Sequence, residues 1–103
     1  MIKLFSYGTL CQKDVQLSEF GQEFYVEPHL DYIVGWDIIQ VKMYGEYCKV
    51  AIPNPESTSA IFGAIVHIPE EMIPMVDKYE GLEYKKVNIK TLSDVECIMY
   101  VKR

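Results

Sequence analysis

Segments with the pattern of β-strands fill most of this chain, and they constrain its fold more than any other feature. Apolar and polar residues alternate from Trp36 to Met43 and from Tyr84 to Leu92, as they do in half-buried strands. Met1 to Tyr7 is expected to be a strand buried on both faces, and Ala60 to Ile68 is the most apolar strand. The remaining extended segments are Phe24 to Val26, Tyr32 to Val34, Tyr47 to Ile52 and Val95 to Val101.

Helical signals occur in only two places. Asp14 is a favourable N-cap for a short helix that Gly21 ends. A second helix opens at Pro69, has Pro74 within its start and stops at Gly81, a residue type favoured directly after a helix. Its apolar residues form one stripe: Met72, Ile73, Val76 and Tyr79.

Because strands outnumber helices, the pattern predicts an α+β fold of about six or seven strands. A small mixed β-barrel or a strongly curled sheet with short flanking helices fits this better than a βαβ sandwich. Gly63, in the middle of the most apolar strand, indicates a bulge or a close approach to the backbone. The polar loop from Pro53 to Ser59 is too short for a domain linker, so we expect one domain over residues 1–103.

Charge and hydropathy exclude several classes of partner. The formal net charge is −5, and the lysines are scattered apart from the pair Lys85-Lys86, whereas a nucleic-acid-binding protein needs a clustered basic face. No stretch approaches the roughly 18 apolar residues of a membrane helix. Met1 to Phe5 leads directly into a strand, without the features of a signal peptide. We therefore expect a cytoplasmic monomer or weak dimer that binds neither nucleic acid nor membranes.

The cysteines and histidines give no sign of a metal centre. Cys11, Cys48 and Cys97 are widely spaced and are expected to be reduced thiols. Cys11 follows a glycine turn and is an alternative nucleophile, but no histidine lies near it in sequence to activate it. His29 and His67 lack partners at metal-ligand spacing, so we expect no bound metal.

Two segments near opposite ends of the chain carry candidate chemistry. Tyr7-Gly8-Thr9-Leu10 follows the first strand, and a glycine turn offers backbone N–H groups that can hold a carboxylate or an oxyanion. Glu80 ends the second helix, where the helix dipole favours a cation instead. A loop of donors and a displaced acid together indicate proton-transfer chemistry on a carboxyl-bearing substrate.

These segments resemble the gamma-glutamyl cyclotransferase-like family, which has a strand followed by Y-G-[TS]-[LN] and later a D-x-x-E-[GS] helix end followed by Y-x-[RK]. The matching residues here are Tyr7 to Leu10, Asp77 to Gly81 and Tyr84 to Lys86, and the likeness is greatest to the short bacterial-type branch with Y-G-T-L. The resemblance extends over nearly the whole chain. Lys86 stands where the family usually has arginine.

The resemblance implies a mixed β-barrel with a cavity at one end and no metal or cofactor. It implies an enzyme that cyclises a gamma-glutamyl amine or amino acid to 5-oxoproline and releases the amine. Glu80 matches the family's general acid/base, and Tyr7, Gly8, Thr9 and Leu10 match its substrate-binding turn. Tyr84 and Tyr100 are further candidates for lining the cavity.

Two points stay open at this stage. The Glu80 pKa is expected to be raised by the helix end and by Asp77 and Glu83, but a structural Glu80 would instead form a salt bridge with Lys85 or Lys86. A binding or interaction module that keeps the cavity and catalyses nothing is the alternative function. The leaving amine is not assigned.

Overall fold

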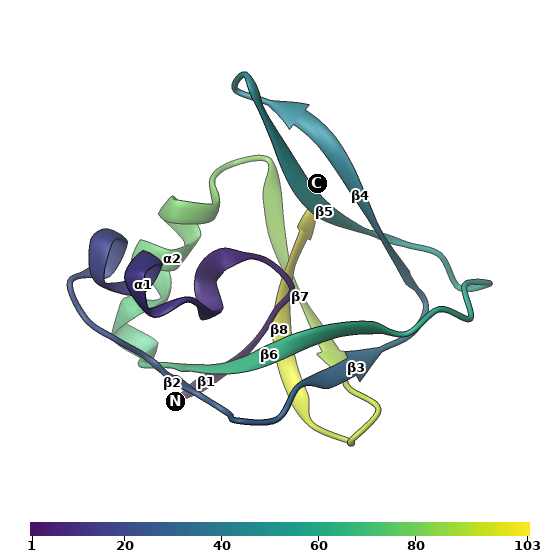
Figure 1. Ribbon diagram of the computed structural model, residues 1–103, viewed down its shortest axis with the longest axis horizontal. Coiled ribbons are helices and arrows are strands. Elements are labelled where there is room, and N and C mark those ends of the chain that lie inside the picture. The colour runs from purple at the N-terminus through teal and green to yellow at the C-terminus, as the bar shows by residue number, and fades with distance from the viewer.

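The computed structural model describes residues 1–103 and consists of eight strands and two α-helices, with two short 3-10 turns (Figure 1). The strands are β1 (Ile2–Ser6), β2 (Tyr25–Val26), β3 (Asp31–Ile33), β4 (Trp36–Met43), β5 (Glu46–Pro53), β6 (Ile61–Ile68), β7 (Tyr84–Lys90) and β8 (Glu96–Lys102). The helices are α1 (Lys13–Phe20) and α2 (Ile73–Glu80).

The strands form one curled mixed sheet and one separate hairpin. The order in the main sheet is β2-β6-β1-β8-β7, and β3 also pairs with β6. The pair β1–β8 is parallel, with Leu4 opposite Ile98, and the other pairs are antiparallel. The predicted α+β class is confirmed. The strand count is eight because both short segments, β2 and β3, pair with β6.

The core has two parts, one on each face of the main sheet. Alternation along β1 sends Leu4 to one face and Phe5 to the other, and both are almost fully buried, as expected. The first part lies under the helices and contains Phe20 and Val76. The second lies within the curl of the sheet, where Ala51 of β5 packs with residues of β8.

The helices begin and end for different reasons. A 3-10 turn, Thr9–Cys11, leads almost directly into α1, so the helix begins at Lys13 with Gln12 as its N-cap. The prediction of Asp14 as N-cap is therefore wrong, since Asp14 lies in the first helical turn. A second 3-10 turn, Glu70–Met72, precedes α2. Gly21 and Gly81 both have positive φ and end their helices as predicted.

Gly63 of β6 permits close contact with β1. A Cβ at this position would lie 2.6 Å from the Phe5 ring and 2.8 Å from the Ser6 carbonyl oxygen. The predicted close approach is therefore confirmed, and it is the packing of the Phe5 ring against β6 that requires glycine.

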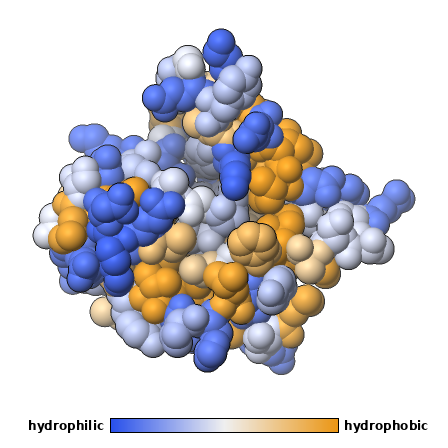
Figure 2. Space-filling model, in the orientation of Figure 1, coloured by the Kyte–Doolittle hydropathy of each residue, from blue (hydrophilic) through white to orange (hydrophobic).

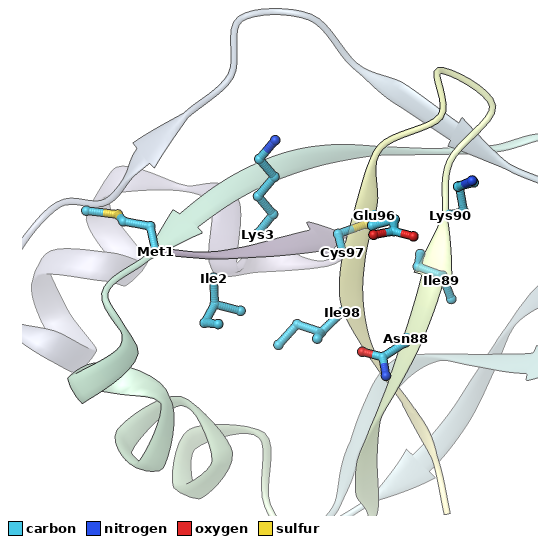
Figure 3. A pocket seen from close by; sticks show the side chains of 9 residues that line it. All are labelled: Met1, Ile2, Lys3, Asn88, Ile89, Lys90, Glu96, Cys97 and Ile98. Carbon is cyan, nitrogen blue, oxygen red and sulfur yellow. The ribbon is translucent and has the colours of Figure 1, made fainter.

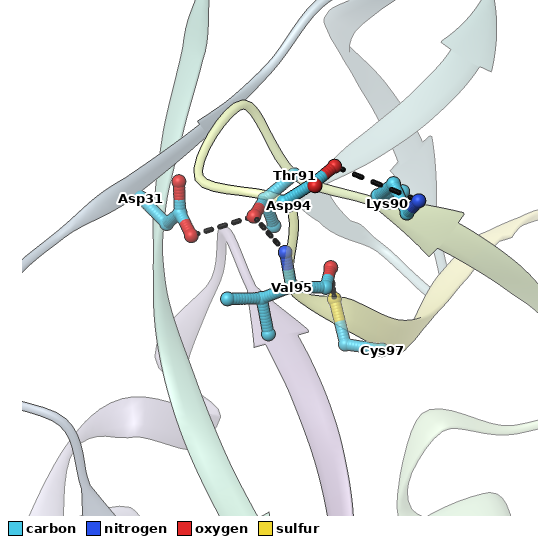
Figure 4. A network of polar contacts seen from close by, with 6 residues as sticks. All are labelled: Asp31, Lys90, Thr91, Asp94, Val95 and Cys97. Carbon is cyan, nitrogen blue, oxygen red and sulfur yellow. Dashed lines mark hydrogen bonds and ion pairs between the residues drawn. The ribbon is translucent and has the colours of Figure 1, made fainter.

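A buried polar contact joins β3 to the turn between β7 and β8 (Figure 4). The Thr91 hydroxyl donates to Asp31 at 2.6 Å, and it accepts from the Val95 N–H at 3.1 Å. Burial acts to raise the pKa of Asp31, but the hydrogen bonds from Thr91 and the Tyr32 N–H outweigh it, and the pKa lies below its ordinary value.

The hairpin β4–β5 projects from the main sheet (Figure 1). Its eight residue pairs run from Trp36 opposite Pro53 to Met43 opposite Glu46. Tyr44 and Gly45 form the two-residue turn at its tip, both with positive φ. Neither α1 nor α2 has the length and apolar character needed to cross a membrane.

Candidate active site

The turn after β1 presents open backbone. Gly8 lies between β1 and the 3-10 turn, and its N–H donates to no acceptor within the protein. A Cβ at Gly8 would have no atom within 4 Å, so the space above this backbone is empty of protein. The predicted donor at Gly8 is therefore free for a ligand.

Gln16 of α1 holds this turn in place. Its side chain is fully buried, its Nε2 donates to the Leu10 carbonyl at 2.8 Å, and its Oε1 accepts from the Phe24 N–H at 2.7 Å. Sequence analysis missed this residue. The signal was its spacing, because Gln16 lies four residues before Phe20 and so shares its buried helix face.

The Tyr7 hydroxyl joins three strands at the site. It donates to the Tyr100 carbonyl of β8 at 2.6 Å and accepts from the Ala51 N–H of β5 at 3.2 Å. Burial raises the pKa of Tyr7 above its ordinary value, so the phenol is neutral at physiological pH. The hydroxyl proton is already donated to the Tyr100 carbonyl, so Tyr7 has no free proton to donate to a ligand.

The two candidate segments meet although about seventy residues separate them. The hydroxyls of Thr9 and Tyr79 are 3.2 Å apart, which joins the glycine turn to the last turn of α2. The Phe20 ring packs edge-on against Tyr79, with the ring centroids 5.6 Å apart. Burial is the main cause that raises the pKa values of Tyr7, Tyr84 and Tyr100, and the charge of Glu80, the next residue, adds a smaller contribution to each.

Glu80 has no polar partner within the protein. Its side chain is partly buried, and it forms neither an ion pair nor a hydrogen bond. Burial raises its pKa from 4.5 to about 7. The direction agrees with the expectation, but the cause is loss of hydration and not the helix end or the neighbouring acids. At neutral pH, Glu80 can therefore accept or give a proton.

The expected basic partners of Glu80 lie elsewhere. Lys86 forms an ion pair with Asp77 at 3.0 Å, and Lys85 forms none. The Tyr100 hydroxyl donates to the other oxygen of Asp77 at 2.6 Å. Burial acts to raise the pKa of Asp77, but these two hydrogen bonds outweigh it and hold the pKa below its ordinary value. The structure therefore does not contain the salt bridge of a structural Glu80.

The hydroxyls of Tyr84 and Tyr100 both donate hydrogen bonds within the protein, so neither is free to donate to a ligand. The Tyr84 hydroxyl donates to the Lys49 carbonyl of β5 at 3.1 Å, and burial raises its pKa to about 12. Tyr100 is only 6% exposed, and its hydroxyl proton is held by Asp77. The charge of Glu80 adds a smaller contribution to the raised pKa values of both tyrosines, after their own burial.

Concavities occur at several places on the surface. Figure 2 shows the surface hollowed between the hairpin, at the top of the view, and the helices, at the left. A cavity of about 640 Å³ lies elsewhere and is shown in Figure 3. Its lining residues, Met1 to Lys3, Asn88 to Lys90 and Glu96 to Ile98, include none of the candidate site. The candidate site is defined by the contact between the Thr9 and Tyr79 hydroxyls, which joins the glycine turn to the end of α2 that carries Glu80.

No group of three or more His, Cys, Asp or Glu side chains is arranged to hold a metal ion. None of the three cysteines forms a disulfide. Cys11 donates only a weak hydrogen bond to the Gly8 carbonyl, at 3.4 Å. The absence of a metal from the reaction remains a prediction.

Comparison with known proteins identifies the family. Residues 4–103 match the family model described as gamma-glutamyl cyclotransferase, AIG2-like. The chain belongs to this family. Family membership accounts for the pairing of a Y-G-T-L turn with an acid at a helix end. No curated protein matches the chain in a sequence comparison.

Solved structures show the same fold at low sequence identity. A protein from Arabidopsis thaliana has a TM-score of 0.75 at 17% identity, over 98% of this chain and 61% of its own. A protein from Homo sapiens has a TM-score of 0.72 at 14% identity, over 99% of this chain and 66% of its own. A structure described as gamma-glutamyl cyclotransferase has a TM-score of 0.62 at 13% identity, with the same two shares. This chain therefore spans about two thirds of the length of these proteins or slightly less.

Proposed function

We propose that this protein is a cyclotransferase that converts a gamma-glutamyl amine or amino acid to 5-oxoproline and releases the amine, with Glu80 as general acid/base. The observation that carries the proposal is the partly buried, unpartnered Glu80 carboxylate, whose pKa burial raises to about 7. A structural acid would have a partner, whereas a proton-transfer group needs to be free and poised near neutral pH.

The reaction balances around one proton. The α-amine of the substrate attacks its own γ-carbonyl carbon, a C–N bond forms, and the C–N bond to the leaving amine breaks. Glu80 accepts the proton that the attacking amine loses and donates it to the departing nitrogen. Because both partners belong to one molecule, ring closure needs no second bound reactant.

The Gly8 N–H supports the oxyanion in this proposal. Its hydrogen is unengaged, and space for a ligand lies above the turn. A backbone donor in a fixed turn stabilises charge that develops on the carbonyl oxygen as the amine attacks. Burial of the Glu80 side chain keeps the proton affinity of its carboxylate high.

The test is release of 5-oxoproline, measured by mass spectrometry across a panel of gamma-glutamyl amino acids and amines. We expect turnover of at least one substrate, and a fall of roughly 10²-fold or more in the variant Glu80→Gln, as is typical when a general acid–base is lost. Binding of that substrate should persist in calorimetry, because the amide keeps the size of the side chain.

Glu83→Gln is the matched control. Glu83 is an exposed acid three residues after Glu80, and its side chain forms no hydrogen bond or ion pair. The Glu83→Gln variant should therefore turn over substrate as fast as the native protein. Tight binding of a gamma-glutamyl ligand without any 5-oxoproline would instead favour a non-catalytic binding module. Full activity in Glu80→Gln would remove Glu80 from the mechanism.

A further inference from the structure

Lys86 forms its ion pair with Asp77 of α2 and not with Glu80, the acid that ends the same helix. Lys86 stands on β7 directly opposite Tyr100 on β8, so the two side chains share one face of the sheet. Tyr84, two residues earlier on β7, is on that same face and is close enough to Glu80 to feel its charge. The flexible stem of a lysine spans the remaining step along the strand.

Asp77 and Glu80 are neighbours on the same helix. Residues three apart on an α-helix lie side by side, about 5–6 Å between Cβ atoms. A lysine that reaches the first carboxylate can therefore reach the second with a change of rotamers. The two acids thus compete for one ammonium group.

Asp77 binds the Lys86 ammonium through an ion pair, and a second hydrogen bond orients the Asp77 carboxylate. Its Oδ2 is 3.0 Å from Lys86 Nζ, and its Oδ1 accepts the Tyr100 hydroxyl at 2.6 Å, which fixes the carboxylate plane. Side chains of the pair are 38% and 43% exposed, so the ion pair by itself contributes little to stability. The consequence of the ion pair is therefore sought in the position it gives the Lys86 ammonium, and not in stability.

We propose that Asp77 is a positioning residue that holds the Lys86 ammonium away from the Glu80 carboxylate. The inference rests on the proposed function, in which Glu80 must remain free to exchange a proton. Loss of Asp77 would let Lys86 turn toward Glu80 and form the salt bridge that the native structure lacks. Glu80 would then be held in its charged form.

Titratable groups of the surrounding elements also bear on the site. They come from the turn after β1, from α2, from β5, from β7 and from β8: Tyr7, Asp77, Tyr79, Cys48, Tyr84, Lys86 and Tyr100. Arg103 adds a second cation, since its Nε donates to the Leu82 carbonyl at 2.8 Å, two residues after Glu80. Of these two cations, Lys86 is the one that pairs with an acid of α2.

The experiment measures the Glu80 titration directly, by carboxyl-carbon NMR, in four proteins: native, Asp77→Asn, Lys86→Met and the double variant. Asp77→Asn should lower the Glu80 pKa by about one pH unit or more, as an approaching cation does. Lys86→Met alone should change it less, and in the opposite direction. The double variant should return it to near the native value, because no lysine is left to move.

The thermodynamic cycle separates this proposal from the plain loss of a neighbouring negative charge. If Lys86 relocates, the Glu80 pKa shifts of the two single variants do not add up to the shift of the double variant. The shift in Asp77→Asn is then larger than the difference between the double variant and Lys86→Met. Strictly additive shifts, or an unchanged Glu80 pKa in Asp77→Asn, would overturn the proposal. Asp77→Ala, which favours the helix, repeats the measurement if the asparagine variant is not folded.

This titration needs no turnover, so it is independent of the proposed reaction. Absence of 5-oxoproline from every substrate would reject the reaction and leave the NMR result standing. If the native protein is active, the acid limb of its pH–rate profile should move to lower pH in Asp77→Asn and move back in the double variant. A limb that does not follow the NMR pKa would show that Asp77 positions Lys86 without affecting catalysis.

Discussion

Glu80 illustrates how a single side chain acquires reactivity from what its surroundings lack. Its side chain is partly buried and forms no ion pair, since Lys86 pairs with Asp77. Burial favours the protonated form, so the folded protein binds this proton more tightly than the unfolded chain does. The acid should therefore lower stability at alkaline pH.

The pH dependence of stability tests this at the level of the residue. Because the Glu80 pKa is raised from 4.5 to about 7, native stability relative to Glu80→Gln should fall as pH rises from about 4.5 to 7 and stay low above that. We expect the variant to be equally stable at pH 4 and more stable at pH 8, by on the order of 1–3 kcal/mol. Chemical denaturation at both pH values measures this difference. Equal stability of the two proteins at pH 8 would contradict a raised pKa.

Some of this residue-level picture follows from sequence and some does not. The position of Glu80 just before Gly81 predicts an acid at a helix end. The engagement of Lys86 with Asp77 depends on the register of β7 against β8, which pairs Lys86 with Tyr100. Local sequence carries no information on that register.

At the level of elements, β1 is held between β6 and β8, and Gly63 shows how closely two of these strands approach. Gly63→Ala would place a methyl group 2.6 Å from the Phe5 ring. We expect a loss of about 1–3 kcal/mol in the free energy of unfolding, the usual cost of overpacking. Gly8→Ala is the matched control, because an added Cβ there meets nothing within 4 Å and its φ is also negative. Equal effects of the two alanines would contradict the packing argument.

The Tyr7 hydroxyl is one of two polar connections to the hairpin strand β5, the other being the Tyr84 hydroxyl on the Lys49 carbonyl. Tyr7→Phe leaves the Tyr100 carbonyl and the Ala51 N–H without this partner. We expect the free energy of unfolding to fall by about 1–3 kcal/mol, measured by denaturant titration. Tyr47→Phe should change it little, since that exposed hydroxyl has no hydrogen bond. An unchanged free energy of unfolding in Tyr7→Phe would contradict a stabilising role of these two hydrogen bonds.

Alternation predicted most strands, since a period of two is a local property of the chain. The predicted N-cap of α1, Asp14, was wrong because a 3-10 turn over Thr9–Cys11 precedes the helix, which begins at Lys13. Such a turn has no clear sequence signal. Sheet order was not predictable either, because each neighbour of β1 comes from a distant part of the chain.

In the whole molecule, the hairpin β4–β5 is attached differently from every other strand. Its two strands pair only with each other, and all eight residues of β4 are partly or fully exposed. We expect its amides to exchange with solvent faster than those of β1, β6 and β8, because local opening requires few buried contacts to break. Native-state hydrogen exchange measures this. Equal protection of hairpin and sheet would show that they unfold as one unit.

The parallel pair β1–β8 places the first and last strands of the chain side by side in the middle of the sheet. During synthesis, β6 follows β1 by about fifty-five residues, and β8, the other neighbour of β1, follows it by about ninety. Until then, both core layers are incomplete, and neither the Tyr100 ring nor its carbonyl is present to receive Tyr7. Pairing of such distant segments slows folding, since the loop entropy is lost before the contacts form. The apolar faces of β1 are therefore not fully covered until β8 has been made, and the contacts around Tyr7 are completed only then.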